Sequence, residues 1–183
     1  MIPTRAECLI LIKRYEMLPH IVRHSKIVTQ VALLLGRKLN DCGCDLDLDL
    51  VEAGALLHDI TKTASIETKE NHAHTGADLL LSLGYPAVAD VVRQHITLDP
   101  RAPYPESISE AELVNYADKR VKHEEVVGIE ERFQDIKKRY ITKFPALQER
   151  FEEVRLETQL VEKKIFSKID LSPEQVQTVL FEP

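Results

Sequence analysis

Residues 53–62, Ala-Gly-Ala-Leu-Leu-His-Asp-Ile-Thr-Lys, place His58 and Asp59 side by side in an apolar helical run, with Lys62 directly behind them. An unpaired carboxylate is rarely fully buried, because removing it from water is costly or forces it to take up a proton. The doublet therefore predicts either a hydrogen-bonded partner for Asp59 or a metal ion. The remaining histidines and aspartates of the chain decide between these two interpretations.

The composition bounds the class of protein. The chain has 183 residues, enough for one domain with a core that needs no disulfides. Its net charge of −6 argues against a duplex nucleic-acid binder, which usually carries a basic face. It does not exclude a local basic pocket for a phosphate.

Cysteine usage and hydropathy predict a cytoplasmic protein. The chain has an odd number of cysteines: Cys8, Cys42 and Cys44. Their spacing differs from that of common zinc or redox motifs, which favours reduced thiols. No stretch approaches the roughly 20 apolar residues that span a bilayer. We also find no secretory signal in residues 1–20, and therefore expect no membrane partner.

Capping motifs, prolines and glycines divide the chain into a succession of helices. The predicted helices cover residues 4–18, 20–39, 48–60, 70–83, 86–95, 109–123, 129–142 and 145–168, with a short last helix after Ser172. Residues 63–69 are a predicted connector. The proline-rich stretch 96–108 is either a lid or a mere connector. No segment is a good strand candidate, so the predicted class is all-α.

Five predicted helices each place one titratable side chain on their apolar face. His24, His58, His72, His95 and Asp118 all have apolar or small residues three, four or seven positions away. One such residue is usually a hydrogen-bonded member of the core. Five together favour convergence on a metal site, and imidazole and carboxylate donors suit zinc, iron or manganese.

These residues resemble the signature of the HD-domain superfamily of metal-dependent phosphohydrolases. Residues 57–62, Leu-His-Asp-Ile-Thr-Lys, look like its central motif, and Asp118 stands in Tyr-Ala-Asp-Lys. The stretch 72–77, His-Ala-His-Thr-Gly-Ala, and the pair Gln94-His95 resemble the extra histidines of members with two metals. The resemblance covers about residues 20–125. It implies a helical bundle, and we assign the phosphohydrolase domain to residues 1–125. Beyond residue 125 the resemblance says little, and we expect residues 126–183 to form a helical C-terminal extension packed on the domain.

The resemblance also implies a ligand set. One divalent metal would be held by His24, His58, Asp59 and Asp118. Asp59 would bridge to a second, held also by His72 and His95. Iron, manganese, zinc or cobalt would fit, with magnesium as a further option. A paired-metal site lowers the pKa of bound water and clamps the attacking and leaving oxygens of a displacement at phosphorus.

Two basic residues are candidates to bind a substrate phosphate. The transition state of phosphoryl transfer carries negative charge on its equatorial oxygens, and Lys62 is the first candidate to compensate it. Arg120 is the weaker one, because its spacing from Asp118 points it away from the ligand face. His72 and His74 point about 200° apart on a helix, so only one can be a ligand. The spacing to Gly76 selects His72.

The resemblance thus predicts a phosphohydrolase of a phosphoester or phosphoanhydride in a nucleotide-like substrate, with Asp59 and Lys62 as catalytic residues. Diadenosine tetraphosphate is one substrate to consider, but residues 96–100 read Ile-Thr-Leu-Asp-Pro, where the subfamily that cleaves it has a Thr-x-Gly stretch. A mononucleotide phosphatase and a cyclic-nucleotide phosphodiesterase stay open. The alternative from another class is a nucleotide-sensing module without turnover. A complete ligand set counts against it.

The C-terminal extension carries a narrow apolar seam. Its members recur at alternating spacings of four and three: Leu147, Phe151, Val154, Thr158, Val161 and Ile165. Such a seam is typical of a coiled coil, but it is equally expected of a helix that covers its own domain. The sequence leaves both interpretations open: packing on the core, or a homodimer through the C-terminal helices.

Overall fold

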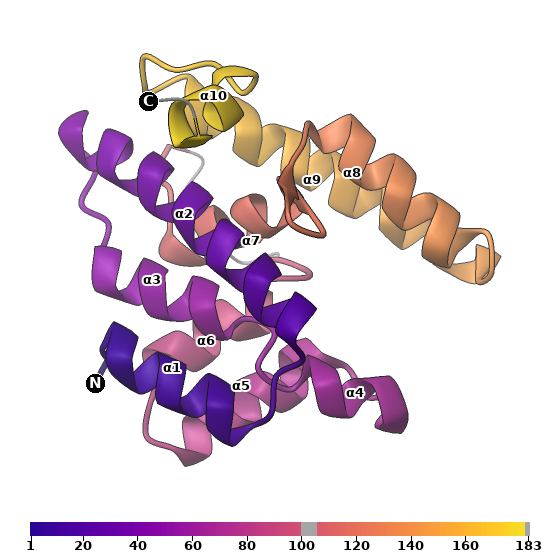
Figure 1. The fold of residues 1–183 in the computed structure, drawn as a ribbon. Helices are drawn as coiled ribbons and strands as arrows, with labels where there is room; N and C mark the ends of the chain where they lie inside the picture. The colour runs from indigo at the N-terminus through magenta and orange to yellow at the C-terminus, as the bar shows by residue number, and fades with distance from the viewer. Residues whose placement is uncertain (100–105, 182–183) are drawn as a thin grey trace.

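The computed structural model describes residues 1–99 and 106–181, and these residues form a helical bundle (Figure 1). The all-α prediction is confirmed. Six helices precede the gap: α1 (Arg5–Arg14), α2 (Pro19–Asp41), α3 (Leu48–Leu57), α4 (Lys62–Thr68), α5 (His72–Ser82) and α6 (Pro86–Gln94). After it come α7 (Glu110–Lys119), α8 (Ile129–Ile136), α9 (Gln148–Phe166) and α10 (Gln175–Phe181). A π-helical turn, η1 (Lys137–Ile141), and a 3₁₀ turn, η2 (Pro145–Leu147), link α8 to α9.

The helix starts follow from local chemistry. Thr4 and Ser109 each form a complete capping box with the glutamate three residues on, so the free amides of α1 and α7 are satisfied. Asn71 caps α5 by accepting a hydrogen bond from the Ala73 amide. Pro19 and Pro86 occupy the first turns of α2 and α6, where proline costs no hydrogen bond.

Helix α3 lies at the centre of the bundle. It packs against α1, α2, α6 and α7, and every residue from Ala53 to Leu57 is buried. One apolar cluster joins α3 to α2, α7 and the C-terminal helices, and a second joins it to α1, α5 and α6. The carboxyl end of α3 therefore points into the interior between two cores. His58 and Asp59 lie at this end.

Two of the differences from the sequence prediction lie next to His58 and Asp59. Helix α3 ends at Leu57 rather than at Ile60, so His58 and Asp59 lie in a turn just beyond it. Most of the predicted connector 63–69 instead belongs to α4 (Lys62–Thr68), and Lys69 follows as its left-handed C-cap. Because the two residues lie in a turn, their side chains point to different partners: His58 toward Asp118, and Asp59 toward His72.

A small hairpin follows α7. Strands β1 (Val121–Lys122) and β2 (Glu125–Val126) pair antiparallel, with His123 in a left-handed conformation at φ 56° in the turn. Two-residue strands leave almost no periodic signal, so the sequence did not indicate them. Of the predicted loop 96–108, residues 100–105 lie outside the described residues, and its proposed role as a lid stays a prediction.

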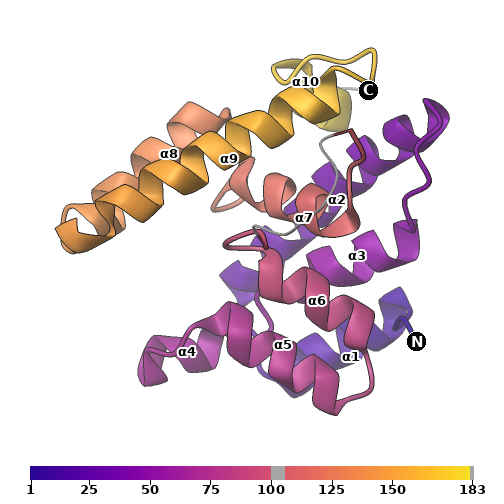
Figure 2. The same cartoon turned by 180° about the vertical axis from the view of Figure 1, so that it is seen from behind.

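The C-terminal helices form a hairpin whose far end projects from the bundle (Figure 2). The part of the seam on α9 faces the chain's own core: Phe151, Thr158, Val161 and Ile165 are buried, and Val154 packs beside them. The first member of the predicted seam, Leu147, precedes α9 and is 50% exposed. Phe151 meets Phe133 of α8 with ring centroids 5.5 Å apart. The apolar side chains of α9 thus pack against other parts of the same chain. Among the described helices, none has the length and apolarity needed to cross a membrane.

Candidate metal centre

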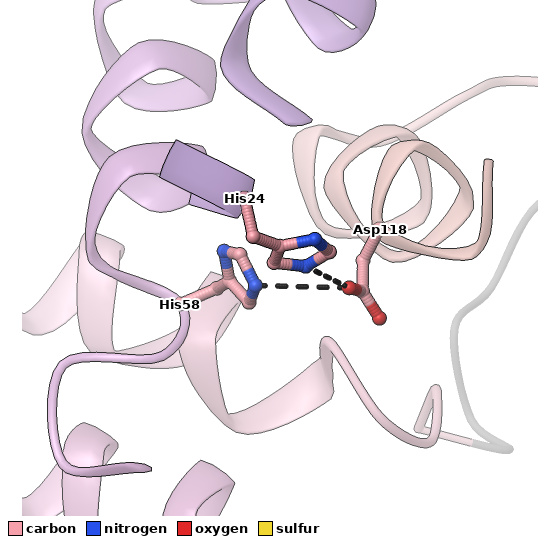
Figure 3. A group of neighbouring side chains, drawn as sticks. All are labelled: His24, His58 and Asp118. Carbon is pink, nitrogen blue, oxygen red and sulfur yellow. Dashed lines mark hydrogen bonds and ion pairs between the residues drawn. The ribbon is translucent and has the colours of Figure 1, made fainter. Parts of the chain in front are cut away.

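The first group of candidate ligands consists of His24, His58 and Asp118, which come from α2, the end of α3 and α7 (Figure 3). His24 Nε2 lies 2.9 Å from Asp118 Oδ1, and His58 Nε2 lies 3.7 Å from the same oxygen. The side chain of His58 is completely buried and that of Asp118 is 15% exposed. Three donors from three helices thus converge on one point.

A second group lies directly beside the first and consists of Asp59, His72 and His95. Asp59 Oδ1 is 3.1 Å from His72 Nε2 and 3.6 Å from His95 Nε2. Its other oxygen, Oδ2, is 3.3 Å from His58 Nε2 in the first group. One buried carboxylate therefore faces both groups, which is the position that the family resemblance implies for a bridging residue.

Three histidines are held in one ring orientation by the backbone. Each has its Nδ1 within hydrogen-bonding distance of a carbonyl oxygen, which fixes Nδ1 as the protonated nitrogen and leaves the Nε2 lone pair for a ligand. The pairs are His24 with His123 at 2.9 Å, His58 with Ala55 at 2.8 Å and His95 with Val92 at 2.7 Å. For His58 and His95 the carbonyl lies three residues upstream.

The donor atoms fit a pair of divalent cations. His58 Nε2 and Asp59 Oδ1 are buried and make no hydrogen bond within the protein. Buried polar atoms are seldom left without a partner, so each such atom calls for an explanation. A cation between the donors would supply it. All six donors are imidazole nitrogens or carboxylate oxygens, which suits a transition metal of intermediate softness.

The charges in the site also favour a cation. Burial raises the pKa of a carboxyl group, but His58 and Lys62 beside Asp59 hold its pKa well below the ordinary value. Neighbouring histidines likewise keep the pKa of Asp118 well below its ordinary value despite burial. Burial lowers the pKa of His95 to about 4, so this imidazole is neutral at pH 7 and able to bind a metal. The two carboxylates therefore stay ionised and His95 stays neutral at pH 7, and these are the protonation states in which such groups bind a metal.

Lys62 is the nearest basic group. Its Nζ donates to Asp59 Oδ2 at 2.7 Å, and its side chain remains 36% exposed. Burial opposes the charged form, but the carboxylates of Asp59 and Asp118 raise the pKa of Lys62, so it stays an ammonium at neutral pH. The lysine thus lies at the centre with a side open to solvent.

The structure does not bring Arg120 to the centre. Its buried guanidinium donates to the Val127 carbonyl at 2.6 Å, to the Tyr116 hydroxyl at 2.6 Å and to the Pro173 carbonyl at 2.9 Å. These partners link α7 to the C-terminal helices. Arg120 is therefore corrected from a phosphate candidate to a residue that holds the bundle together.

Of the two histidines at the start of α5, His72 and His74, the helix directs only His72 toward the centre. Helix α5 begins at His72, so the facing argument applies, and His72 points at Asp59 while His74 is exposed. Gly76 lets α5 approach closely: a Cβ there would lie 3.2 Å from Val92 Cγ1 and 3.4 Å from Ile60 Cγ2. The close approach brings His72 toward the turn after α3.

Two supporting residues were missed in the sequence. Asn115 Nδ2 donates to the carbonyls of Gln94 and His95, at 2.7 and 3.1 Å. Buried Lys119 donates to the same His95 carbonyl at 2.9 Å. Together they bind the free carbonyls at the end of α6 and hold His95 in place. Contacts to backbone atoms have no periodicity, so only their position beside Asp118 could have suggested them.

The sequence matches the HD domain family over residues 21–121, a span of more than half of the chain that contains all six candidate ligands. The chain belongs to the HD-domain family. The family is metal-dependent, which agrees with the two groups of histidine and aspartate side chains described above. Residues 122–183, with the whole of the C-terminal extension, lie outside the match.

Curated relatives provide a second comparison. The chain is 33% identical over 144 residues to a tRNA (cytidine(56)-2'-O)-methyltransferase of Thermoplasma volcanium, and 30% identical over 145 residues to the enzyme of that name from Picrophilus torridus. These alignments cover 69% and 71% of this chain but only 40% of each relative. An uncharacterized protein of Methanocaldococcus jannaschii is 34% identical over 80 residues, covering 42% of this chain and 45% of the relative. No solved structure matches the chain.

Proposed function

We propose that this chain is a metal-dependent phosphohydrolase that cleaves a phosphoester or phosphoanhydride bond in a nucleotide-like substrate. One observation carries the proposal: two groups of buried nitrogen and oxygen donors face each other through the single carboxylate of Asp59. A site that only sensed a nucleotide would not need two complete ligand sets. This proposal places the activity in the matched HD domain.

Each residue has a role in this proposal. His24, His58 and Asp118 would hold one divalent metal, His72 and His95 would hold a second, and Asp59 would be a ligand in both sets. Such a pair, when bound, lowers the pKa of water and polarises the phosphoryl oxygens. The backbone carbonyls behind the imidazoles keep their Nε2 atoms aimed at the centre.

Lys62 carries out the electrostatic part of the reaction in this proposal. Its ammonium is held at 2.7 Å from Asp59, with a third of the side chain open to solvent, where a substrate would enter. Charge that grows on the phosphoryl oxygens meets a cation that is already in position, which is how preorganised donors lower a barrier. We expect Lys62 to act on the transition state more than on metal binding.

A cavity of about 350 Å³ beside the second group offers room for the rest of the substrate. Its walls include Ala73 and Gln94, the chain neighbours of His72 and His95, together with the polar side chains of His74 and Arg93. The volume is at the lower end of the range of small-molecule sites. We propose that the organic part of the substrate lies here while its phosphate reaches the metals.

The names of two relatives add a second class of substrate to be tested. Both are tRNA methyltransferases, and the matched segment is 40% of each. We propose a phosphate on RNA as an alternative substrate in place of a free nucleotide. The net charge of −6 still disfavours broad binding to a duplex, so a single strand or a terminus is the more suitable target.

The experiment is a substrate panel with a controlled metal. Protein stripped with a chelator is reloaded with manganese, iron, cobalt, zinc or magnesium. It is then assayed on mononucleotides, cyclic nucleotides, diadenosine tetraphosphate and RNA oligonucleotides with terminal phosphates. We expect hydrolysis that needs the metal and is abolished in a folded Asp59→Ala variant. Tight nucleotide binding without turnover under every metal would instead support the sensing module.

A further inference from the structure

Arg132, the fourth residue of α8, has a largely buried side chain whose guanidinium group lacks a full set of partners. The residue lies outside the family match. Its side chain is only 14% exposed, and the Nε atom is buried with no hydrogen-bond partner in the protein. Its acidic neighbour is Asp135, which NH1 meets at 3.4 Å. A buried donor without an acceptor destabilises the folded protein, and more so when the group is charged.

Other arginines of the same region are better satisfied. Arg139 takes the larger share of Asp135, through Nε at 2.9 Å and through NH2. Arg155 pairs with Glu152 at 2.9 Å and with Glu130 at 3.3 Å. Among these three, Arg132 combines the least exposure with the poorest pairing. Its Nε is therefore available for an anion from outside the chain.

The elements around Arg132 lead to the metal centre. Helix α8 packs against α7, which carries Asp118, and against β1. The hairpin formed by β1 and β2 contains His123, whose carbonyl fixes His24. Asp135, the neighbour of Arg132, also binds Arg139, whose NH2 lies 3.0 Å from Nε2 of the same His123.

We propose that Arg132 binds a phosphate oxygen of the substrate at the metal centre, so that the C-terminal extension supplies part of the substrate site. The inference rests on the proposed phosphohydrolase function. A guanidinium is suited to this role, because its planar fork of donors matches the oxygens of a phosphate. Lys62 already donates to Asp59, whereas the Nε of Arg132 awaits an acceptor. In this proposal Lys62 binds Asp59 and faces the metal site, while Arg132 binds a phosphate oxygen through its free Nε.

The test measures the binding of inorganic phosphate to metal-loaded protein by isothermal titration calorimetry. Arg132→Met should weaken binding at least tenfold without changing metal content, and Arg132→Lys should recover part of the loss. Arg155→Met is the matched control: the same substitution in the same extension, at an arginine paired with glutamates. It should bind phosphate as the wild type does. Circular dichroism checks that each variant is folded. If Arg132→Met does not fold, the comparison is made with Arg132→Lys.

The outcomes separate this inference from the proposed function. Wild-type affinity for phosphate, together with a wild-type KM for a hydrolysed substrate, in both Arg132 variants would overturn the role of Arg132 and leave the phosphohydrolase intact. A wild-type protein that neither binds phosphate nor hydrolyses any substrate would overturn both. An equal loss in Arg155→Met would show that the effect is a general one of charge, and would overturn the specific assignment.

Discussion

Gly54→Ala should loosen the metal centre by separating two helices. Gly54 lies one turn before His58 on α3, and Val91 lies one turn before His95 on α6. A Cβ at position 54 would be 2.5 Å from Val91 Cγ1 and 3.3 Å from Val91 Cβ. The rings of His58 and His95, whose centroids are 5.1 Å apart, stand directly beyond this crossing.

The size of the effect follows from two opposing contributions. The contact of 2.5 Å must open to at least 3.4 Å, an ordinary van der Waals distance. Valine in a helix has one strongly preferred rotamer, so Val91 cannot turn aside cheaply and the helices must move. Overpacking of this kind costs about 1–3 kcal/mol. Alanine is better than glycine in a helix by about 1 kcal/mol, which leaves a net destabilisation of about 1 kcal/mol.

Urea unfolding followed by circular dichroism would measure this loss, and elemental analysis would follow the metal. The midpoint of thermal unfolding should fall by about 2–4 °C. In the Val91→Ala background the extra methyl has room, so Gly54→Ala should there stabilise the protein by about 1 kcal/mol, the helix-propensity difference alone. A single Gly54→Ala variant that is more stable than the wild type and keeps its metal would refute the argument.

Three further predictions follow from the site and the core. Lys62→Ala should lower kcat by the equivalent of about 2–4 kcal/mol, with metal content unchanged, as single-turnover assays and elemental analysis would show. His72→Ala should lose about one metal per chain, whereas His74→Ala, on the exposed side of the same turn, should lose none. Burial raises the pKa of Cys8 to about 12, so iodoacetamide at pH 9 should modify exposed Cys42 and leave Cys8 intact until urea is added. Because the unfolded Cys8 thiol ionises near pH 9 while the folded one keeps its proton, this residue should also make the free energy of unfolding fall as the pH rises above 9.

Helical periodicity predicted which side chains of a helix point into the core, and part of the site follows from that. His24, His95 and Asp118 have apolar neighbours at helical spacings, and each lies in or at the end of a helix with its side chain turned inward. The choice of His72 over His74 rested on the same reasoning. The inward side of a helix is the side that carries its apolar stripe. That stripe can be recognised from the sequence of the one helix alone.

Other features depend on contacts between segments far apart in the sequence. The turn at His58 and Asp59 reads as a continuation of α3, because nothing in Ile60-Thr61 breaks a helix by itself. Arg132 stands among Glu130, Glu131 and Asp135, a pattern typical of a solvated face, yet its guanidinium is mostly buried. Its burial depends on how α8 packs against α7, and periodicity within α8 does not reveal that packing.

The central claim is that the six candidate ligands hold a pair of metal ions. Elemental analysis of wild-type protein, purified without chelator and then saturated with manganese or zinc, tests it most directly. The account predicts two metal ions per chain in the wild type, and loss from both positions in a folded Asp59→Ala variant, because this carboxylate faces both groups. A wild-type chain that binds no metal, or an Asp59→Ala variant that keeps two, would contradict it.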